Sequence, residues 1–84
     1  MSGSEPGDST LVTLGRTIRG ARRAREMSQE ALGCAAGLAA KHVSEIERGN
    51  RDVRFTTLVR VAKGLGVSVG GLLSIYDLER TANN

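Results

Sequence analysis

Residues that cross-link or fill small domains are scarce in this sequence. Its 84 residues include one cysteine, one histidine, one proline and two aromatic side chains, and no tryptophan. A single cysteine excludes an internal disulfide, and one cysteine with one histidine cannot supply the four ligands of a structural zinc site. We therefore expect no disulfide, no bound metal and no cofactor.

Long apolar runs and catalytic patterns are also missing. No stretch approaches the roughly 20 apolar residues that cross a bilayer, and the opening MSGSEPGDST lacks the basic and apolar regions of a signal peptide. The sequence contains no nucleophile with a matching base, no phosphate-binding glycine loop and no metal cluster. It therefore predicts a cytoplasmic, nucleoid-associated protein that does not bind membranes and is not an enzyme.

The apolar residues that are present favour packed helices. They are mostly Leu, Val, Ile and Ala, which suit helix packing better than a β-sandwich when aromatic residues are so few. A chain of 84 residues holds one domain with a small core, so we expect its stability to depend on a partner subunit. The predicted fold class is all-α.

Hydrophobic periodicity divides the chain into two tails and one helical domain. We expect residues 1–9 to form a flexible tail, residues 10–78 the domain and residues 79–84 a C-terminal tail. Helices are expected over about 10–25, 29–36 and 40–48, then over a segment that ends at Gly66 and a short one capped by Ser68. Ser28 can cap the second helix and Gly37 can end it, so the tight connection to the third predicts a helix-turn-helix.

The positive charge is a mild excess that is concentrated in two places. The formal charge is +3 and the isoelectric point is about 9.8. One cluster of arginines lies before the helix-turn-helix and contains Arg16, Arg19, Arg22, Arg23 and Arg25. The other lies at its end and beyond and contains Arg48, Arg51 and Arg54. Either cluster alone could be an ordinary solvated helix face, but two clusters flanking one motif favour nucleic-acid binding.

A resemblance to a known family is carried by the stretch SQEALGCAAGLAAKHVSEIERGNRDVRFTTLVRVAKGLGV. With its Ser-Gln opening, turn glycine, Ile-Glu-Arg-Gly ending and Leu-Gly-Val after the fourth helix, it resembles the lambda-repressor-like, Xre-type (Cro-type) helix-turn-helix regulators. The resemblance extends roughly from Leu14 to Leu73. It implies a five-helix DNA-binding domain, usually dimeric, whose third helix enters the major groove.

The resemblance also implies which residues face the bases of double-stranded DNA. By motif position they are Ala39, Ala40, Lys41, Ser44 and Glu45. Lys41 would bond guanine O6 or N7, Glu45 would accept from cytosine N4, and Ala40 would touch a thymine methyl. Because Ala39 and Ala40 stand where the family often has polar side chains, we expect DNA shape to carry part of the specificity.

Phosphate contacts are expected around the third helix, where they would supply affinity and register. The residues that the resemblance implies for them are Gln29, Arg48, Asn50, Arg51 and Arg54. His42 stands where many relatives carry an aromatic or polar side chain, and it is open between a DNA contact and an ordinary surface residue.

Other positions concern the fold more than the DNA. Arg22 and Glu47 resemble a pair that packs between the first and third helices of the family, so we expect an ion pair there. Gly33 replaces the family's usual Ala, and Glu26 replaces its usual Gly, so the turn at Glu26 is expected to be strained or reshaped. Cys34 lies in the middle of a helix with no second cysteine, which argues against a redox switch.

The C-terminal segment is unusually apolar for so small a domain. Its candidate dimer contacts are Leu72, Leu73, Ile75, Tyr76 and Leu78. Left exposed on a monomer they would form a large apolar patch, so we expect a homodimer. The alternative is that these residues are ordinary core residues of the fifth helix.

The sequence therefore predicts a sequence-specific, DNA-binding transcriptional regulator that acts as a homodimer on an inverted-repeat operator, without a small-molecule ligand. A stand-alone domain fits a restriction-modification controller protein, a phage-type repressor or an antitoxin-like regulator, and the sequence does not choose between them. The alternative function is a protein-interaction module, or an antitoxin-like partner, that retains the fold. The arginines argue against this alternative.

Overall fold

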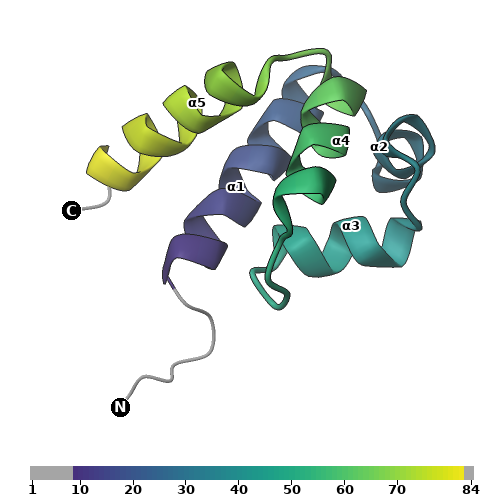
Figure 1. Cartoon of the computed structure of the whole chain (residues 1–84), viewed down its shortest axis with the longest axis horizontal. Coiled ribbons are helices and arrows are strands. Elements are labelled where there is room, and N and C mark those ends of the chain that lie inside the picture. Colours follow the sequence, from purple (N-terminus) through teal and green to yellow (C-terminus); the bar gives the residue numbers. More distant parts are fainter. Residues whose placement is uncertain (1–8, 83–84) are drawn as a thin grey trace.

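The computed structural model describes residues 9–82, which form five helices and no strand (Figure 1). The predicted all-α class and the predicted number of helices are confirmed. The helices are α1 (Ser9–Ala24), α2 (Gln29–Ala36), α3 (Ala40–Glu47), α4 (Phe55–Leu65) and α5 (Val69–Ala82).

Figure 1 shows α1 and α4 in the centre of the molecule, with α5 on one side of them and α2 and α3 on the other. Helix α1 packs against both α5 and α3, while α4 packs against α2. The helices meet in one core of buried residues, namely Ile18, Ala21, Leu32, Val43, Ile46, Leu58, Val61, Ala62, Leu65 and Leu72. Every helix contributes at least one side chain, so none of them can be removed without opening the core.

The last helix is longer than predicted. It continues to Ala82, so residues 79–82 are helical where a C-terminal tail was predicted. Glu79 anchors this extension to α1, because its Oε1 lies 3.1 Å from the hydroxyl of Thr17, a fully buried side chain. The predicted N-terminal tail lies outside the described residues, apart from Ser9, where α1 begins.

Two caps fix the ends of α2 as the sequence predicts. The hydroxyl of Ser28 accepts a hydrogen bond of 2.9 Å from the backbone N–H of Ala31. At the other end, Gly37 adopts the left-handed conformation with φ of +73°, and the N–H of Leu38 donates to Gly33 O at 2.8 Å. These contacts set the direction in which the chain leaves α2, and α3 begins three residues after Gly37.

Close backbone contacts at two glycines hold α3 in place. A Cβ atom on Gly33 would lie 2.5 Å from Leu38 O, in the backbone of the turn between α2 and α3. A Cβ atom on Gly15 of α1 would collide with the carbonyl oxygens of Ile46 and Glu47, at the end of α3. The absence of a side chain at both positions lets α3 approach its neighbours closely, and it explains why this chain carries no Ala at Gly33.

The turn after α1 is strained, as its non-glycine residue predicts, but it keeps its ordinary shape. Glu26 has a φ of +56°, in the left-handed region. Its N–H donates to Arg23 O at 2.9 Å, and the N–H of Met27 donates to Arg22 O at 3.1 Å. This is the hydrogen-bond pattern that commonly ends helices at a glycine.

Within residues 9–82, no single helix is long and apolar enough to cross a membrane. Helices α4 and α5 reach that length and composition only together, and a bend of 96° separates them. The same part of the chain has no group of three or more His, Cys, Asp or Glu side chains that could hold a metal ion.

Candidate DNA-binding surface

Helix α3 has one buried side and one open side. Val43 and Ile46 are almost completely buried, with exposed fractions of 1% and 2%. Helical geometry turns the opposite side outward, and we call the residues on it the recognition face: Lys41, Ser44, Glu45 and Arg48. Lys41 and Arg48 are exposed, and Ser44 and Glu45 are half-buried. Four predicted DNA contacts therefore share one surface.

The start of α3 offers little hydrogen-bonding chemistry. Ala39 occupies the N-cap position and makes no side-chain cap, as the sequence predicts. Ala39 is exposed and Ala40 is half-buried. Both can offer only methyl groups to a ligand, which suits the predicted contact of Ala40 with a thymine methyl.

A buried ion pair locks α3 against α1. Arg22 donates from Nε to Glu47 Oε2 at 2.6 Å and from Nη2 to Glu47 Oε1 at 3.0 Å, and the two side chains are only 10% and 3% exposed. Arg22 also donates from Nη1 to Met27 O at 2.7 Å. The hydrogen bonds to Glu47 raise the pKa of Arg22, against the opposing effect of burial. The ion pair that the resemblance implies is thus present, with a third anchor in the turn after α1.

Gln29 is tied to the same carboxylate. Its Nε2 donates to Glu47 Oε1 at 3.1 Å, from the first residue of α2. One of the two amide N–H groups is therefore used inside the protein, and the other is left for the phosphate contact predicted for this residue. Glu47 thereby links the start of α2 to α1 and α3.

A second ion pair lies on the recognition face. Arg51, in the loop between α3 and α4, has its Nε 3.0 Å from Glu45 Oε1. Its Nη1 lies 3.4 Å from Nε2 of His42. The structure thus brings together Glu45 and Arg51, for which the resemblance implies separate DNA contacts, and His42, which was left open. Motif position did not indicate that these residues pair with one another.

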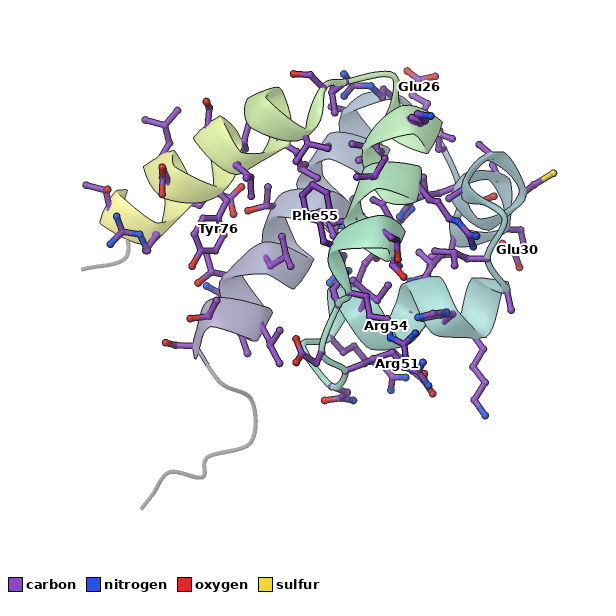
Figure 2. The ribbon with its side chains drawn as sticks, viewed as in Figure 1. Glu26, Glu30, Arg51, Arg54, Phe55 and Tyr76 are labelled. Atoms are coloured by element: carbon purple, nitrogen blue, oxygen red, sulfur yellow. The ribbon has the colours of Figure 1, made fainter. Side chains whose placement is uncertain are left out.

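The remaining predicted phosphate contacts lie around this network. Arg48, Asn50 and Arg54 are all exposed, and Arg48 donates from Nε to Ser44 O at 3.3 Å. Figure 2 shows Arg51 and Arg54 at the lower edge of the molecule, where the loop after α3 leads into α4. Arg51 and Arg54 therefore lie on the same edge of the molecule as α3.

The predicted dimer surface needs a correction. Leu72 is completely buried and belongs to the core, so its assignment to a dimer contact is wrong. Leu73, Ile75 and Leu78 are exposed by 41%, 36% and 71%, and Tyr76 is half-buried. Leu73 and Leu78 are separated by about 140° around the axis of a regular helix. The apolar residues of α5 therefore do not form a single flat patch.

Sequence reasoning missed Phe55. This first residue of α4 is 68% exposed, although it precedes Leu58 by three residues and so follows the spacing of core positions. The exposure of Phe55 could have been inferred from its place at the start of the helix, directly after Arg54, where a side chain can project past the neighbouring helices.

Cys34 is exposed on α2 as a free cysteine.

Comparisons with known proteins agree with this geometry. A sequence model of the helix-turn-helix family matches residues 18–72. The control protein C.SmaI of Serratia marcescens is 36% identical over 66 residues, which are 79% of this chain and 79% of that protein. The control protein C.BamHI of Bacillus amyloliquefaciens is 37% identical over 68 residues, 80% of this chain and 84% of that protein. A helix-turn-helix transcriptional regulator of Sinorhizobium fredii, y4dL, is 40% identical over 52 residues, but these span only 26% of its length.

Solved structures show the same fold. The restriction-modification controller protein C.AhdI from Aeromonas hydrophila superposes with a TM-score of 0.76 at 32% identity, over 77% of this chain and 98% of that one. The controller protein C.Esp1396I superposes with a TM-score of 0.85 at 27% identity, over 89% of this chain and 97% of that one. The chain belongs to the helix-turn-helix family of DNA-binding transcriptional regulators, and it is similar in sequence and fold to restriction-modification controller proteins.

Proposed function

We propose that this regulator binds an inverted-repeat operator as a homodimer and controls the genes of a restriction-modification system. The observation that carries the proposal is the two-sided build of α3, whose inner side is fixed by Val43, Ile46 and Glu47 while its recognition face is open. The similarity to C.SmaI, C.BamHI and C.AhdI, each named as a control or controller protein, supports the choice of system.

In this proposal α3 enters the major groove with its N-terminal end foremost. Lys41 is exposed at that end and can donate to guanine O6 or N7. Arg48, Asn50 and Arg54 contact phosphates on either side, which gives affinity and register but no sequence information. Because so few side chains read bases, a dimer that doubles every contact is needed for useful affinity.

The dimer part of the proposal rests on exposed apolar side chains. Phe55, Leu73, Ile75 and Leu78 are exposed on a molecule of only 84 residues, and a second protomer that covers some of them, with Tyr76 beside them, would remove that surface from water. A two-fold dimer would present two recognition faces to half-sites about one helical turn apart.

The activity of the regulator would then depend on its concentration and on dimerisation, since we propose no small-molecule ligand. We propose the cytoplasm as the place of action because the DNA target lies there.

The test is selection of bound DNA from a random pool, followed by affinity measurements on the selected sequence. We expect a consensus with two-fold symmetry, bound by two protomers, and a steep loss of affinity between about 50 and 200 mM salt. Lys41→Ala should weaken operator binding about tenfold. Lys63→Ala removes the same charge from an exposed position on α4 and should have little effect.

A consensus without two-fold symmetry would contradict the homodimer. Absence of any enriched sequence would favour the protein-interaction module. Equal losses in the Lys41→Ala and Lys63→Ala variants would show that α3 is not the element that reads the operator.

A further inference from the structure

Three side chains on the DNA-binding surface form a network of their own. Glu45 and His42 come from α3, and Arg51 comes from the loop that follows it. Arg51 Nε lies 3.0 Å from Glu45 Oε1, and its Nη1 lies 3.4 Å from His42 Nε2. The Glu45 side chain is 24% exposed and the Arg51 side chain is 49% exposed. Contacts at Nε and Nη1 thus hold the guanidinium, while about half of the Arg51 side chain remains in contact with solvent.

Counting hydrogen-bond donors shows what the network leaves free. A guanidinium only donates, so in this contact Arg51 Nη1 is the donor and His42 Nε2 the acceptor. Arg51 has five N–H groups. Its Nε lies at ion-pair distance from Glu45 and its Nη1 contacts His42, so within residues 9–82 both N–H groups of Nη2 and one N–H of Nη1 remain available. A planar group with a fixed orientation and free donors is suited to a pair of acceptors in one plane.

We propose that Glu45 is a positioning residue that orients Arg51 to read a guanine of the operator. This proposal rests on the DNA-binding function proposed above. Glu45 then does not read cytosine itself, because its carboxylate is engaged with Arg51. The base preference assigned to this part of the surface changes accordingly, from cytosine at Glu45 to guanine at Arg51.

Charge favours a guanine over a phosphate as the partner of Arg51. A phosphate brought to this arginine would also be brought close to the Glu45 carboxylate, and the two negative charges would repel. The O6 and N7 atoms of guanine form a neutral pair of acceptors, which an arginine binds through two N–H groups at once. Two-point binding of this kind depends on orientation, and a fixed carboxylate supplies it.

The first test compares the base preferences of variants by selection from a random DNA pool. Arg51→Met should abolish the preference at one guanine, and Glu45→Ala should weaken the preference at that same guanine. Loss of preference at a different position in Glu45→Ala, above all at a cytosine, would overturn the proposal, because it would mean that Glu45 reads a base directly.

The second test is a double-mutant cycle on the operator selected by the unmodified protein. We expect about tenfold weaker binding for Glu45→Ala and at least that for Arg51→Met. The double variant should be no weaker than Arg51→Met alone, because Glu45 acts through Arg51. Losses that multiply in the double variant would overturn the proposal. So would an equal change of Glu45→Ala affinity for operator and for random DNA, which is the result expected of a phosphate contact.

Asp52→Asn is the matched control. Asp52 is an exposed loop carboxylate next to Arg51 whose Oδ1 accepts from the N–H of Val53, and asparagine keeps that acceptor while removing the charge. It should leave the base preference unchanged. In the free protein, the Nε–H resonance of Arg51 in an NMR spectrum should shift in Glu45→Ala and not in Asp52→Asn, and an unshifted resonance in Glu45→Ala would overturn the proposal.

These outcomes separate the two proposals. If the unmodified protein enriches no sequence, the DNA-binding function proposed for the chain fails and this inference fails with it. If a symmetric operator is enriched but Glu45 and Arg51 affect different positions, only this inference fails.

Discussion

Helix α3 carries two carboxylates, two residues apart, and each of them holds an arginine. Glu47 holds Arg22 in the interior, with side chains 3% and 10% exposed, and Glu45 holds Arg51 at the surface, with side chains 24% and 49% exposed. The buried arginine makes two hydrogen bonds to its carboxylate and a third to the backbone. The exposed arginine has its Nε on the carboxylate, and about half of its side chain remains in contact with solvent.

The difference teaches how one short helix serves two purposes. A buried pair with all three guanidinium nitrogens bonded inside the protein cannot change partners without leaving a charge in the core, so it fixes where α3 lies. An exposed pair contributes little to stability, because water and salt screen it. Its loss would therefore cost the fold little, which suits the role in recognition proposed above, where orientation matters more than binding strength.

The largest loss of stability is expected when Glu47, the carboxylate of the buried pair, is replaced. Glu47→Ala leaves Arg22 charged and buried without its main partner, and it also removes the acceptor used by Gln29. We expect the free energy of unfolding to fall by about 3 to 5 kcal/mol, which for so small a domain approaches complete unfolding. In the variant the interactions with Glu47 that raise the pKa of Arg22 are lost and only the lowering effect of burial remains. Because the ordinary pKa of an arginine lies far above 9, Arg22 still stays protonated, and raising the pH to 9 should not rescue the variant.

Thermal and urea unfolding followed by circular dichroism measure this change. A melting temperature equal to that of the unmodified protein would mean that the buried pair does not hold α3.

The second prediction concerns the close approach that brings Arg22 to Glu47. Gly15→Ala places a methyl group against the carbonyl oxygens at the end of α3, so α1 and α3 must separate or strain. We expect a loss of about 1 to 3 kcal/mol in the free energy of unfolding, typical of overpacking.

Gly20→Ala is the matched control on the same helix. A Cβ there meets only Glu79 Oε2, at 4.0 Å, and alanine improves helix propensity by up to about 1 kcal/mol. The two alanine variants should therefore shift the urea midpoint in opposite directions. A shift of the same sign and size in both would show that helix propensity, and not the contact with α3, sets the effect.

The sequence predicted much of this framework because its signals are local. Helix spacing, Ser28 and Gly37 define the ends of α2, and the caps found in the structure are the ones expected from these residues. The exposure of Phe55 and the burial of Leu72 depend on how helices from distant parts of the chain meet, which periodicity along one helix does not reveal. The end of α5 was missed because Glu79 looks like a tail residue until its contact with Thr17 is known.

For the candidate site, too, the sequence predicted the features that depend on local geometry and missed those that depend on contacts between distant segments. Motif position identified the residues of the recognition face, since helical geometry alone turns them outward. It assigned Glu45 and Arg51 to separate contacts and left His42 open, because it treats each position independently. Their pairing depends on the path of the loop after α3, which carries Arg51 back alongside the helix.

The third prediction concerns the turn that gives Arg22 its backbone partner. Glu26 adopts a left-handed conformation that disfavours side chains, and Met27, the next residue, accepts from Arg22 Nη1. Glu26→Gly should relieve strain in the folded state, partly offset by the greater freedom of glycine in the unfolded chain. We expect a net gain of up to about 1 kcal/mol.

Glu26→Ala is the control, because it removes the same side-chain charge but keeps a Cβ. Urea unfolding of both variants measures the difference. A Glu26→Ala variant as stable as Glu26→Gly would assign the gain to the charge and not to the backbone.

The smallest change in stability is expected at Glu45. Glu45→Ala breaks only the exposed pair with Arg51, and alanine is the best helix former, so the free energy of unfolding should change by less than about 1 kcal/mol. The change should shrink further when salt is raised from 0.1 to about 1 M, since the screening length falls to about 3 Å. Thermal unfolding at both salt concentrations measures it, beside Glu47→Ala. A loss at Glu45 as large as the loss at Glu47, or one that salt does not reduce, would mean that the exposed pair supports the fold. A small loss in stability with a large loss in operator binding would instead show that the two carboxylates of α3, two residues apart, divide folding and recognition between them.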